Sequence, residues 1–178
     1  MSIMKIVLGD NRVDSMAILG GYHSDGSYSV LCSDALLFFD KDDTLINEFP
    51  ISAITPTKCI VSSDCTILAY NENIVGSTTD IIVFANDGEQ ITELELDDKL
   101  IDVDCEDDMI YMLCNNDLVR LDLSDPKPQK CHLEGGGSSI FIADPETVLV
   151  SYSNKVQPYS TESLFSEDKV EQKNDDTE

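Results

Sequence analysis

Apolar and polar residues alternate along most of this chain, and elsewhere the apolar residues form short runs bounded by turn residues. Alternation is typical of half-buried β-strands, and short apolar runs are typical of strands buried on both faces. The 3.6-residue spacing of an amphipathic helix is nearly absent. The pattern therefore predicts an all-β protein whose antiparallel strands come in successive groups of four, with a last group that lacks its fourth strand. The predicted groups are Ser15–Leu19, Tyr28–Cys32, Ala35–Phe39 and Leu45–Ile51; Lys58–Ser62, Thr66–Tyr70, Ile81–Ala85 and Gln90–Leu96; Asp102–Cys105, Met109–Cys114, Asp117–Leu123 and Gln129–Leu133; and Ile140–Ala143, Thr147–Tyr152 and Val156–Tyr159.

These groups repeat with a period of about forty residues. The last large residue of the third strand recurs at spacings of 45, 37 and 38 residues, at Phe39, Phe84, Leu121 and Tyr159. Each is followed by residues that favour tight turns, such as Asn86-Asp87-Gly88. Repeats of this length, built from short strands, are typical of the four-stranded blades of a β-propeller.

The number of blades leaves the overall arrangement open. The chain holds about three and a half blades, whereas closed propellers usually have roughly four to eight. Three arrangements fit: a small four-bladed ring closed by a strand at Met4–Leu8, a dimer of two half-rings, or a curved sheet sandwich. Met4–Leu8 is predicted either to supply the missing fourth strand of the last group or to be the outermost strand of a further blade.

The composition excludes several classes of partner. The chain has 35 acidic residues against 11 Lys and Arg, which gives a formal net charge of −24. Phosphate backbones and anionic lipid surfaces repel such a chain, so we expect no nucleic-acid binding. No apolar run reaches the ~18 residues of a membrane span, and the first residues do not resemble a signal peptide. We therefore expect no membrane insertion and a cytoplasmic location.

The composition changes again near the C-terminus. Residues 160–178 hold seven acidic residues and few apolar ones. A segment of this kind cannot bury enough apolar surface to fold by itself. The sequence thus predicts a propeller-like repeat domain over residues 1–159 and a disordered acidic tail over residues 160–178.

The six cysteines and two histidines are predicted to have packing or surface roles instead of catalytic ones. None of the cysteines forms a Cys-x-x-Cys pair, and most lie in apolar strands, which favours buried, reduced thiols. His23 lies in a Gly- and Asp-rich loop, and His132 lies on an outer strand, where it is expected to face solvent. Neither has the partners of a nucleophilic triad in the nearby sequence. The cysteines are Cys32, Cys59, Cys65, Cys105, Cys114 and Cys131.

The remaining motifs give no cofactor or metal site. Gly135-Gly136-Gly137 lacks the Lys-Ser/Thr of a phosphate-binding loop and is predicted to connect two blades. Clusters of aspartates could offer oxygen ligands to Ca²⁺, but none has the spacing of a calcium loop. We expect solvated turns there, no cofactor and no catalytic residues. The clusters are Asp40, Asp42 and Asp43; Asp97 and Asp98; and Asp102 and Asp104 with Glu106, Asp107 and Asp108.

Two strand–turn units carry a resemblance to a known family. They are Leu-Phe-Phe-Asp-Lys-Asp-Asp at Leu37–Asp43 and Val-Phe-Ala-Asn-Asp-Gly at Val83–Gly88. The chain has no Trp and so is unlike WD40 repeats, although the blade pattern is similar. These units resemble the repeats of quinoprotein-like (PQQ-like) propellers, in particular a family of unknown function from anaerobic Gram-positive bacteria. The resemblance implies a partial ring of about half the family's length. It implies no cofactor, because the Trp-rich docking signature of quinoprotein enzymes is missing.

The sequence favours a binding function over a catalytic one. We expect a non-catalytic binding or scaffold module that contacts a protein partner, or a second copy of itself, through exposed blade faces. One loop departs from the repeat pattern and is the predicted interaction loop, with Asn71, Glu72, Asn73 and Gly76. The alternative is a hydrolase or lyase that uses carboxylates in a propeller channel.

Overall fold

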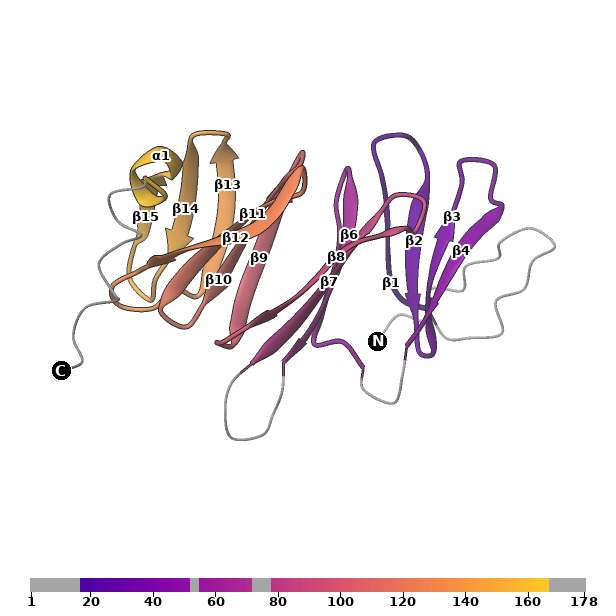
Figure 1. The fold of residues 1–178 in the computed structure, drawn as a ribbon, viewed down its shortest axis with the longest axis horizontal. Coiled ribbons are helices and arrows are strands. Elements are labelled where there is room, and N and C mark those ends of the chain that lie inside the picture. The colour runs from indigo at the N-terminus through magenta and orange to yellow at the C-terminus, as the bar shows by residue number, and fades with distance from the viewer. Residues whose placement is uncertain (1–16, 52–54, 72–77, 167–178) are drawn as a thin grey trace. The chain divides into compact units, whose positions relative to one another are not determined.

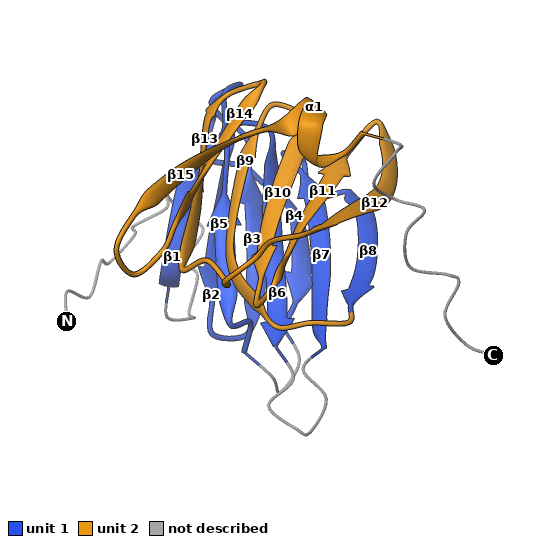
Figure 2. Cartoon of the chain, turned by 90° about the vertical axis from the view of Figure 1, so that its left-hand side faces the viewer, with its two compact units in different colours: residues 1–96 blue, residues 97–178 orange. Residues whose placement is uncertain are grey.

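The computed structural model describes residues 17–51, 55–71 and 78–166 and confirms an all-β fold. The strands in these ranges form four antiparallel sheets, three with four strands and one with three. The chain divides into two compact units, residues 1–96 and residues 97–178, each of which holds two sheets (Figure 2). Within every sheet the strands pair in the order in which they occur in the sequence, as in the blades of a propeller (Figure 1).

The first sheet shows how the alternation in the sequence becomes a blade. Its strands are β1 (Ala17–Tyr22), β2 (Tyr28–Cys32), β3 (Ala35–Phe39) and β4 (Leu45–Pro50). All residues of β2 and β3 are buried, which means that both faces of the sheet centre are covered, whereas β4 is mostly exposed. The two-residue turn at Ser33 and Asp34 sets the register by pairing Leu31 with Leu36.

The second sheet packs against the first within the same unit. Its strands are β5 (Lys58–Val61), β6 (Cys65–Asn71), β7 (Thr79–Ala85) and β8 (Gln90–Leu96). One face of the first sheet meets this sheet in an apolar cluster that includes Leu36, Phe38 and Phe84. Gly88 closes the β7–β8 turn at a φ of +82°, and a Cβ atom there would lie 2.6 Å from Cδ2 of Phe38. Glycine is required at this turn for both the backbone conformation and the close approach of the sheets.

The second unit repeats the arrangement with a shorter last sheet. The third sheet contains β9 (Leu100–Glu106), β10 (Met109–Cys114), β11 (Asp117–Asp122) and β12 (Asp125–His132). The fourth contains β13 (Ser139–Asp144), β14 (Thr147–Ser151) and β15 (Val156–Ser160), so the last group has three strands in the described residues, as predicted. Residues 135–137 connect β12 to β13, which confirms the assignment of the glycine-rich stretch to a connection between blades.

A short helix follows where a fourth strand would come. The helix α1 (Thr161–Leu164) is capped by the Ser160 side chain, and its Leu164 and the following Phe165 are buried. Phe165 lies in the cluster that joins the third and fourth sheets, with the Arg120 guanidinium 4.6 Å from the centre of its ring. Residues 161–165 therefore belong to the folded unit, whereas the sequence predicted an acidic tail from residue 160. The rest of that predicted tail, residues 167–178, lies outside the described residues.

The strand boundaries differ from the sequence prediction at two places with identifiable causes. β1 extends to Tyr22 because the Gly20-Gly21 pair continues the pairing with β2 as far as Tyr28. β12 begins at Asp125 instead of Gln129 because Pro126 and Pro128 lie on an outer strand, where a missing N–H is tolerated. The strand predicted at Met4–Leu8 lies outside the described residues, so the closed ring, the half-ring dimer and the sandwich all stay predictions.

Candidate functional site

A buried chain of hydrogen bonds joins the first two sheets at His23. The Nδ1 atom of His23 lies 2.8 Å from the carbonyl oxygen of Ser62. Because a carbonyl oxygen only accepts, Nδ1 carries the proton and Nε2 is left to accept from the Ser29 hydroxyl at 2.7 Å. Ser29 in turn lies 2.9 Å from the hydroxyl of Thr66. The sequence analysis placed His23 in a loop, and in the structure both of its ring nitrogens form hydrogen bonds that hold the two sheets together.

This chain of bonds contains a serine–histidine pair that the sequence analysis did not find. Ser29 and His23 have the separation of a nucleophile and its base, and the Ser62 carbonyl orients the ring. However, the Ser29 side chain has no exposed surface, and His23 is buried as well. A substrate cannot reach the hydroxyl, so the pair is built for packing. The six-residue spacing of His23 and Ser29 is the only sequence signal for it.

Two carboxylates of β9 have a comparable role in the second unit. Asp102 and Asp104 accept hydrogen bonds from the backbone N–H groups of Ile140 and Ile142, at 3.1 and 2.8 Å. These N–H groups belong to β13, the first strand of the next sheet. The sequence considered both aspartates as oxygen ligands in an acidic cluster. The structure shows them on a strand, where they tie neighbouring sheets together.

Several aspartates serve as turn residues, among them Asp40 of the predicted clusters. Asp40 accepts from the backbone N–H of Asp42, and Asp87 accepts from that of Glu89. Such Asx turns stabilise the hairpins and use the carboxylate locally. The same bond to the residue two positions later occurs at Asp25, Asp40, Asp87, Asp122 and Asp144. Hydrogen bonds from Ser27 hold the pKa of Asp25 below its usual value, and those from Ser124 do the same for the pKa of Asp122.

No metal centre is assembled in the parts of the chain that the structure describes. Asp25, Asp40 and Asp87 line one shallow hollow together with Lys41. Yet the described residues contain no group of three or more His, Cys, Asp or Glu side chains positioned to hold an ion. The described stretches also contain no helix that is long and apolar enough to cross a membrane.

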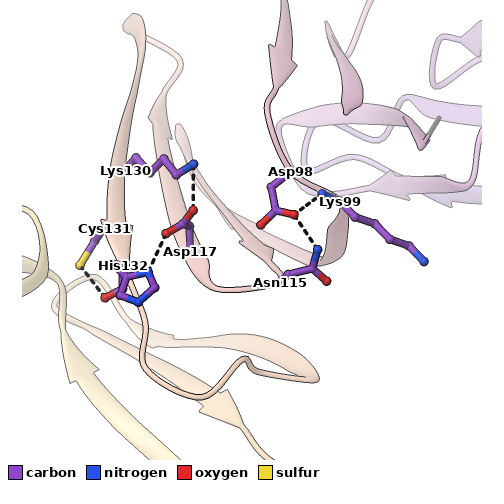
Figure 3. A network of polar contacts seen from close by, with 7 residues as sticks. All are labelled: Asp98, Lys99, Asn115, Asp117, Lys130, Cys131 and His132. Atoms are coloured by element: carbon purple, nitrogen blue, oxygen red, sulfur yellow. Dashed lines mark hydrogen bonds and ion pairs between the residues drawn. The ribbon is translucent and has the colours of Figure 1, made fainter. Parts of the chain in front are cut away.

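An exposed ionic network lies at one end of the third sheet (Figure 3). Asp117 on β11 accepts from Lys130 at 2.8 Å and from Nδ1 of His132 at 3.1 Å, both on β12. Burial of the Asp117 carboxyl opposes its ionisation, but the bonds from Lys130 and His132 outweigh it and leave its pKa below the usual value. The Cys131 thiol points to the backbone oxygen of His132, away from the imidazole ring. His132 is exposed on an outer strand, as predicted, and the thiol, imidazole and carboxylate do not converge on one point.

The cysteines are packing residues or partly exposed thiols. None of the six is in a disulfide. Burial raises the pKa of Cys59 to about 12, and burial together with the Asp98 charge does the same for Cys114. Both thiols therefore stay protonated and weakly nucleophilic at neutral pH.

The predicted interaction loop is only partly described. Asn71 ends β6, where its side-chain oxygen accepts a hydrogen bond from Thr79 at 2.6 Å and its backbone N–H donates to Thr57. Asn71 thus anchors the base of the loop. Glu72, Asn73 and Gly76 lie outside the described residues.

The fourth sheet has an exposed apolar face, which we call the Phe141 face: Phe141 of β13, Leu149 of β14, and Val156 and Pro158 of β15. Phe141 pairs with Leu149 across β13 and β14, and Leu149 pairs with Pro158 across β14 and β15, so the three form one row. The exposed fraction is 60% for Phe141 and 61% for Val156. The opposite face, with Ile140, Ile142 and Val148, is buried against the third sheet.

The outward face of the first sheet is different, and we call it the Val30 face: Tyr28, Val30 and Cys32 of β2 with Ala35, Leu37 and Phe39 of β3. These six residues form one apolar cluster and are at most 7% exposed. Among the described residues, the apolar neighbour packed against this cluster is Ala17, which belongs to the same sheet.

Comparison with known proteins supports the fold but does not identify a function. No family model matches the chain, and no curated protein matches it in sequence. The chain is similar to several solved structures of β-propeller type. One is BBS1N in complex with ARL6DN, with a TM-score of 0.53 and 13% sequence identity, where the match covers 85% of this chain and 53% of that chain. Others are Hsv2 of Kluyvelomyces marxianus (0.60, 9%, 82% and 49%) and Sqt1 of Saccharomyces cerevisiae (0.54, 10%, 78% and 43%).

The chain thus spans about half the length of the solved chains that it resembles. At such low identities the likeness shows the fold alone. The predicted blades are confirmed by it, while the resemblance to the quinoprotein-like family stays a prediction.

Proposed function

We propose that the chain is a non-catalytic binding module that docks a protein partner through the Phe141 face. The observation that carries this proposal is the row of Phe141, Leu149 and Pro158 on the surface of a chain with a net charge of −24. Exposed apolar surface on a highly charged protein marks a site that another molecule covers. A phosphate backbone would be repelled by the charge, which leaves a protein as the partner.

The internal packing of the chain indicates what fits this face. In the second unit, the opposite face of the same sheet is covered by another antiparallel sheet through Ile140, Val148 and Leu113. A partner that presents a flat apolar sheet would bury the Phe141 face in the same way. The BBS1N chain, about half of which resembles this chain, is in complex with ARL6DN in the solved structure. A propeller-type chain with this similarity thus binds another protein, which supports the proposal.

The placement of the catalytic candidates supports a non-catalytic role. The one serine–histidine pair in the described residues is inaccessible, and Asp102 and Asp104 are engaged by backbone N–H groups. The predicted loop at Asn71 remains a second contact region in this proposal, on the other unit of the chain.

Site-specific photocrosslinking in cells tests the proposal. A benzophenone amino acid replaces Phe141, and in a matched control it replaces Tyr22, an aromatic residue of the first sheet that is 77% exposed. We expect a covalent adduct of discrete mass from position 141 and none from position 22. The adduct should disappear when Leu149→Asp is introduced beside position 141.

Three outcomes would overturn the proposal. They are equal crosslinking from both positions, no adduct from position 141, or an adduct that survives Leu149→Asp. An adduct of twice the chain mass would identify the partner as a second copy, which light scattering of the purified protein would confirm as a dimer.

A further inference from the structure

The Phe141 face carries no charge, although the chain around it is strongly charged. Strand register places the four residues of this face and two serines in two complete rows across β13, β14 and β15, and none of the six is ionisable. In the whole chain, by contrast, 26% of the residues are charged and the net charge is −24. The rows are Ser139, Ser151 and Val156, and Phe141, Leu149 and Pro158.

A neutral face suits contact between two identical surfaces. When a face meets its own copy, carboxylates on it are brought close to the carboxylates of the partner, and like charges placed opposite each other repel. A face that meets a different protein has no such restriction, because opposite charges on the partner can match its own. The hydroxyls of Ser139 and Ser151 can both donate and accept, so they can face their own copies as well. The composition of the Phe141 face therefore favours a second copy of this chain as its partner.

The two edges of the fourth sheet do not offer a comparable contact. At the β13 edge, the backbone N–H groups of Ile140 and Ile142 are bound by the carboxylates of Asp102 and Asp104. At the opposite edge, the middle residue of β15 is Pro158, which has no N–H to donate to an added strand. A second copy would therefore meet this sheet face to face, as two sheets pack in a β-sandwich.

The first sheet indicates which surface of the second copy takes part. A head-to-tail contact between the last and first sheets would place the Phe141 face of one copy on the outward face of the first sheet of the next. That outward face, the Val30 face, is at most 7% exposed and is not open to a partner. The Phe141 face is open, and contact between two such faces is isologous, with the same surface contributed by both copies.

We propose that two copies of this chain dock through their Phe141 faces in a two-fold symmetric dimer. This inference rests on the proposed function and names its partner. Three strands of five or six residues, at ~4.8 Å between strands and ~3.4 Å per residue, give the face a footprint of roughly 14 by 17 Å. That footprint is small beside the ~800 Å² that each partner contributes to a standard interface, so we expect a weak, concentration-dependent dimer.

Salt should strengthen this dimer. Each copy has a net charge of −24, so the two copies repel each other outside the neutral contact. Added salt screens that repulsion, because the Debye length falls from ~10 Å at 0.1 M to ~3 Å at 1 M. Sedimentation equilibrium of the purified chain should therefore show a dimer fraction that rises with protein concentration and with NaCl. A dimer fraction that falls as NaCl is added would contradict a contact between neutral faces.

Opposite charges at one position test the self-contact directly. Leu149 lies at the centre of the face, on the middle strand between Phe141 and Pro158, so Leu149→Asp or Leu149→Lys brings like charges together in the dimer. We expect each variant alone to lose affinity by roughly tenfold or more, and the equimolar mixture of the two to recover it as a heterodimer. The matched controls are Tyr22→Asp and Tyr22→Lys, at a position of the first sheet that is 77% exposed, and they should dimerise like the unaltered chain.

Crosslinking of the purified chain keeps the test decisive if a charge at Leu149 unfolds it, which circular dichroism of the variants would show. The benzophenone amino acid is placed at position 141, where the side chain is 60% exposed. We expect an adduct of two chains in which position 141 is joined to a peptide within residues 139–160 of the other copy. Peptide mass spectrometry of the isolated adduct locates the linkage.

The outcomes separate this inference from the proposed function. Three results would overturn the self-contact: a purified chain that is monomeric at every protein and salt concentration, folded Leu149 variants that do not recover the dimer on mixing, or a linkage outside residues 139–160. An adduct of another mass from position 141 in cells would overturn the self-contact and leave the Phe141 face as a docking site. No adduct from position 141, in cells or in the purified chain, would overturn both proposals.

Discussion

The first and last sheets of this chain share a fold pattern but treat their outward faces in opposite ways. Both carry apolar residues at alternating positions of their central strands. In the first sheet the residues of the central strands are buried on both faces. In the last sheet the outward Leu149 of the central strand β14 is only partly buried, and Phe141 and Val156 on the strands beside it are largely exposed. The comparison teaches that alternation fixes which residues share a face, whereas the rest of the molecule decides whether that face meets water.

The interfaces inside the two units differ as well. A chain of hydrogen bonds through His23, Ser29 and Thr66 joins the sheets of the first unit. In the second unit, the carboxylates of Asp102 and Asp104 bind the backbone of β13. We therefore expect the two units to respond differently to substitution.

The largest expected effect comes from the same substitution on the two faces. Leu37→Ala on the Val30 face should lower the free energy of unfolding by about 2–5 kcal/mol, because it opens a cavity in a covered apolar layer. Leu149→Ala on the Phe141 face should lower the free energy of unfolding by only about 1 kcal/mol, because the Leu149 side chain is only half-buried. Urea unfolding of the two variants measures the difference. Equal losses would show that the two faces are covered alike.

An intermediate effect is expected from the polar chain of the first unit. Ser29→Ala removes the donor to Nε2 of His23 and should cost about 1–3 kcal/mol, because a buried acceptor is left without a partner. Ser24→Ala is the matched control, since Ser24 makes an exposed bond to Asp64 at 3.0 Å. Its expected cost is below roughly 0.5 kcal/mol. Thermal unfolding compares the two, and similar losses would contradict the role given to His23.

The smallest effect is expected at Asp117. Its folded-state pKa is lowered, so its contribution to stability is present above the pKa of an unfolded aspartate and is lost as the pH falls through the lower folded value. Asp117→Asn should cost less than about 1 kcal/mol near pH 7, because Lys130 and His132 are largely exposed. Unfolding curves from pH 7 to pH 2 should converge for the two proteins at the acid end. A gap that persists there would contradict the ionic origin of the effect.

Much of the fold could be predicted from local sequence. The tight turns at Ser33-Asp34 and Asn115-Asn116 fix register by themselves, because a two-residue turn leaves one pairing for the strands beside it. The same local logic predicted the three-stranded last sheet. The local sequence predicted the wrong start for β12, because Pro126 and Pro128 are typical of turns. They are tolerated within β12 because it is an outer strand.

The contacts that define the candidate sites are long-range and could not be predicted in this way. His23 bonds to a carbonyl 39 residues away, and Asp104 bonds to an N–H 38 residues away. The turn at His23 has the composition of an ordinary loop, and burial alone distinguishes it. Phe165 was assigned to an acidic tail because few apolar residues surround it in the sequence, yet Leu164 and Phe165 are both buried, with Arg120 and Tyr111 beside the Phe165 ring.

The turn aspartates link the acidity of the chain to the geometry of its hairpins. Five hairpins, distributed over both units, are each fastened by one carboxylate to a backbone amide two residues later. The carboxylate in each of these hairpins is therefore committed to the backbone of its own turn. Five of the 35 acidic residues thus help to form the hairpins, so a part of the chain's negative charge follows from the geometry of its turns.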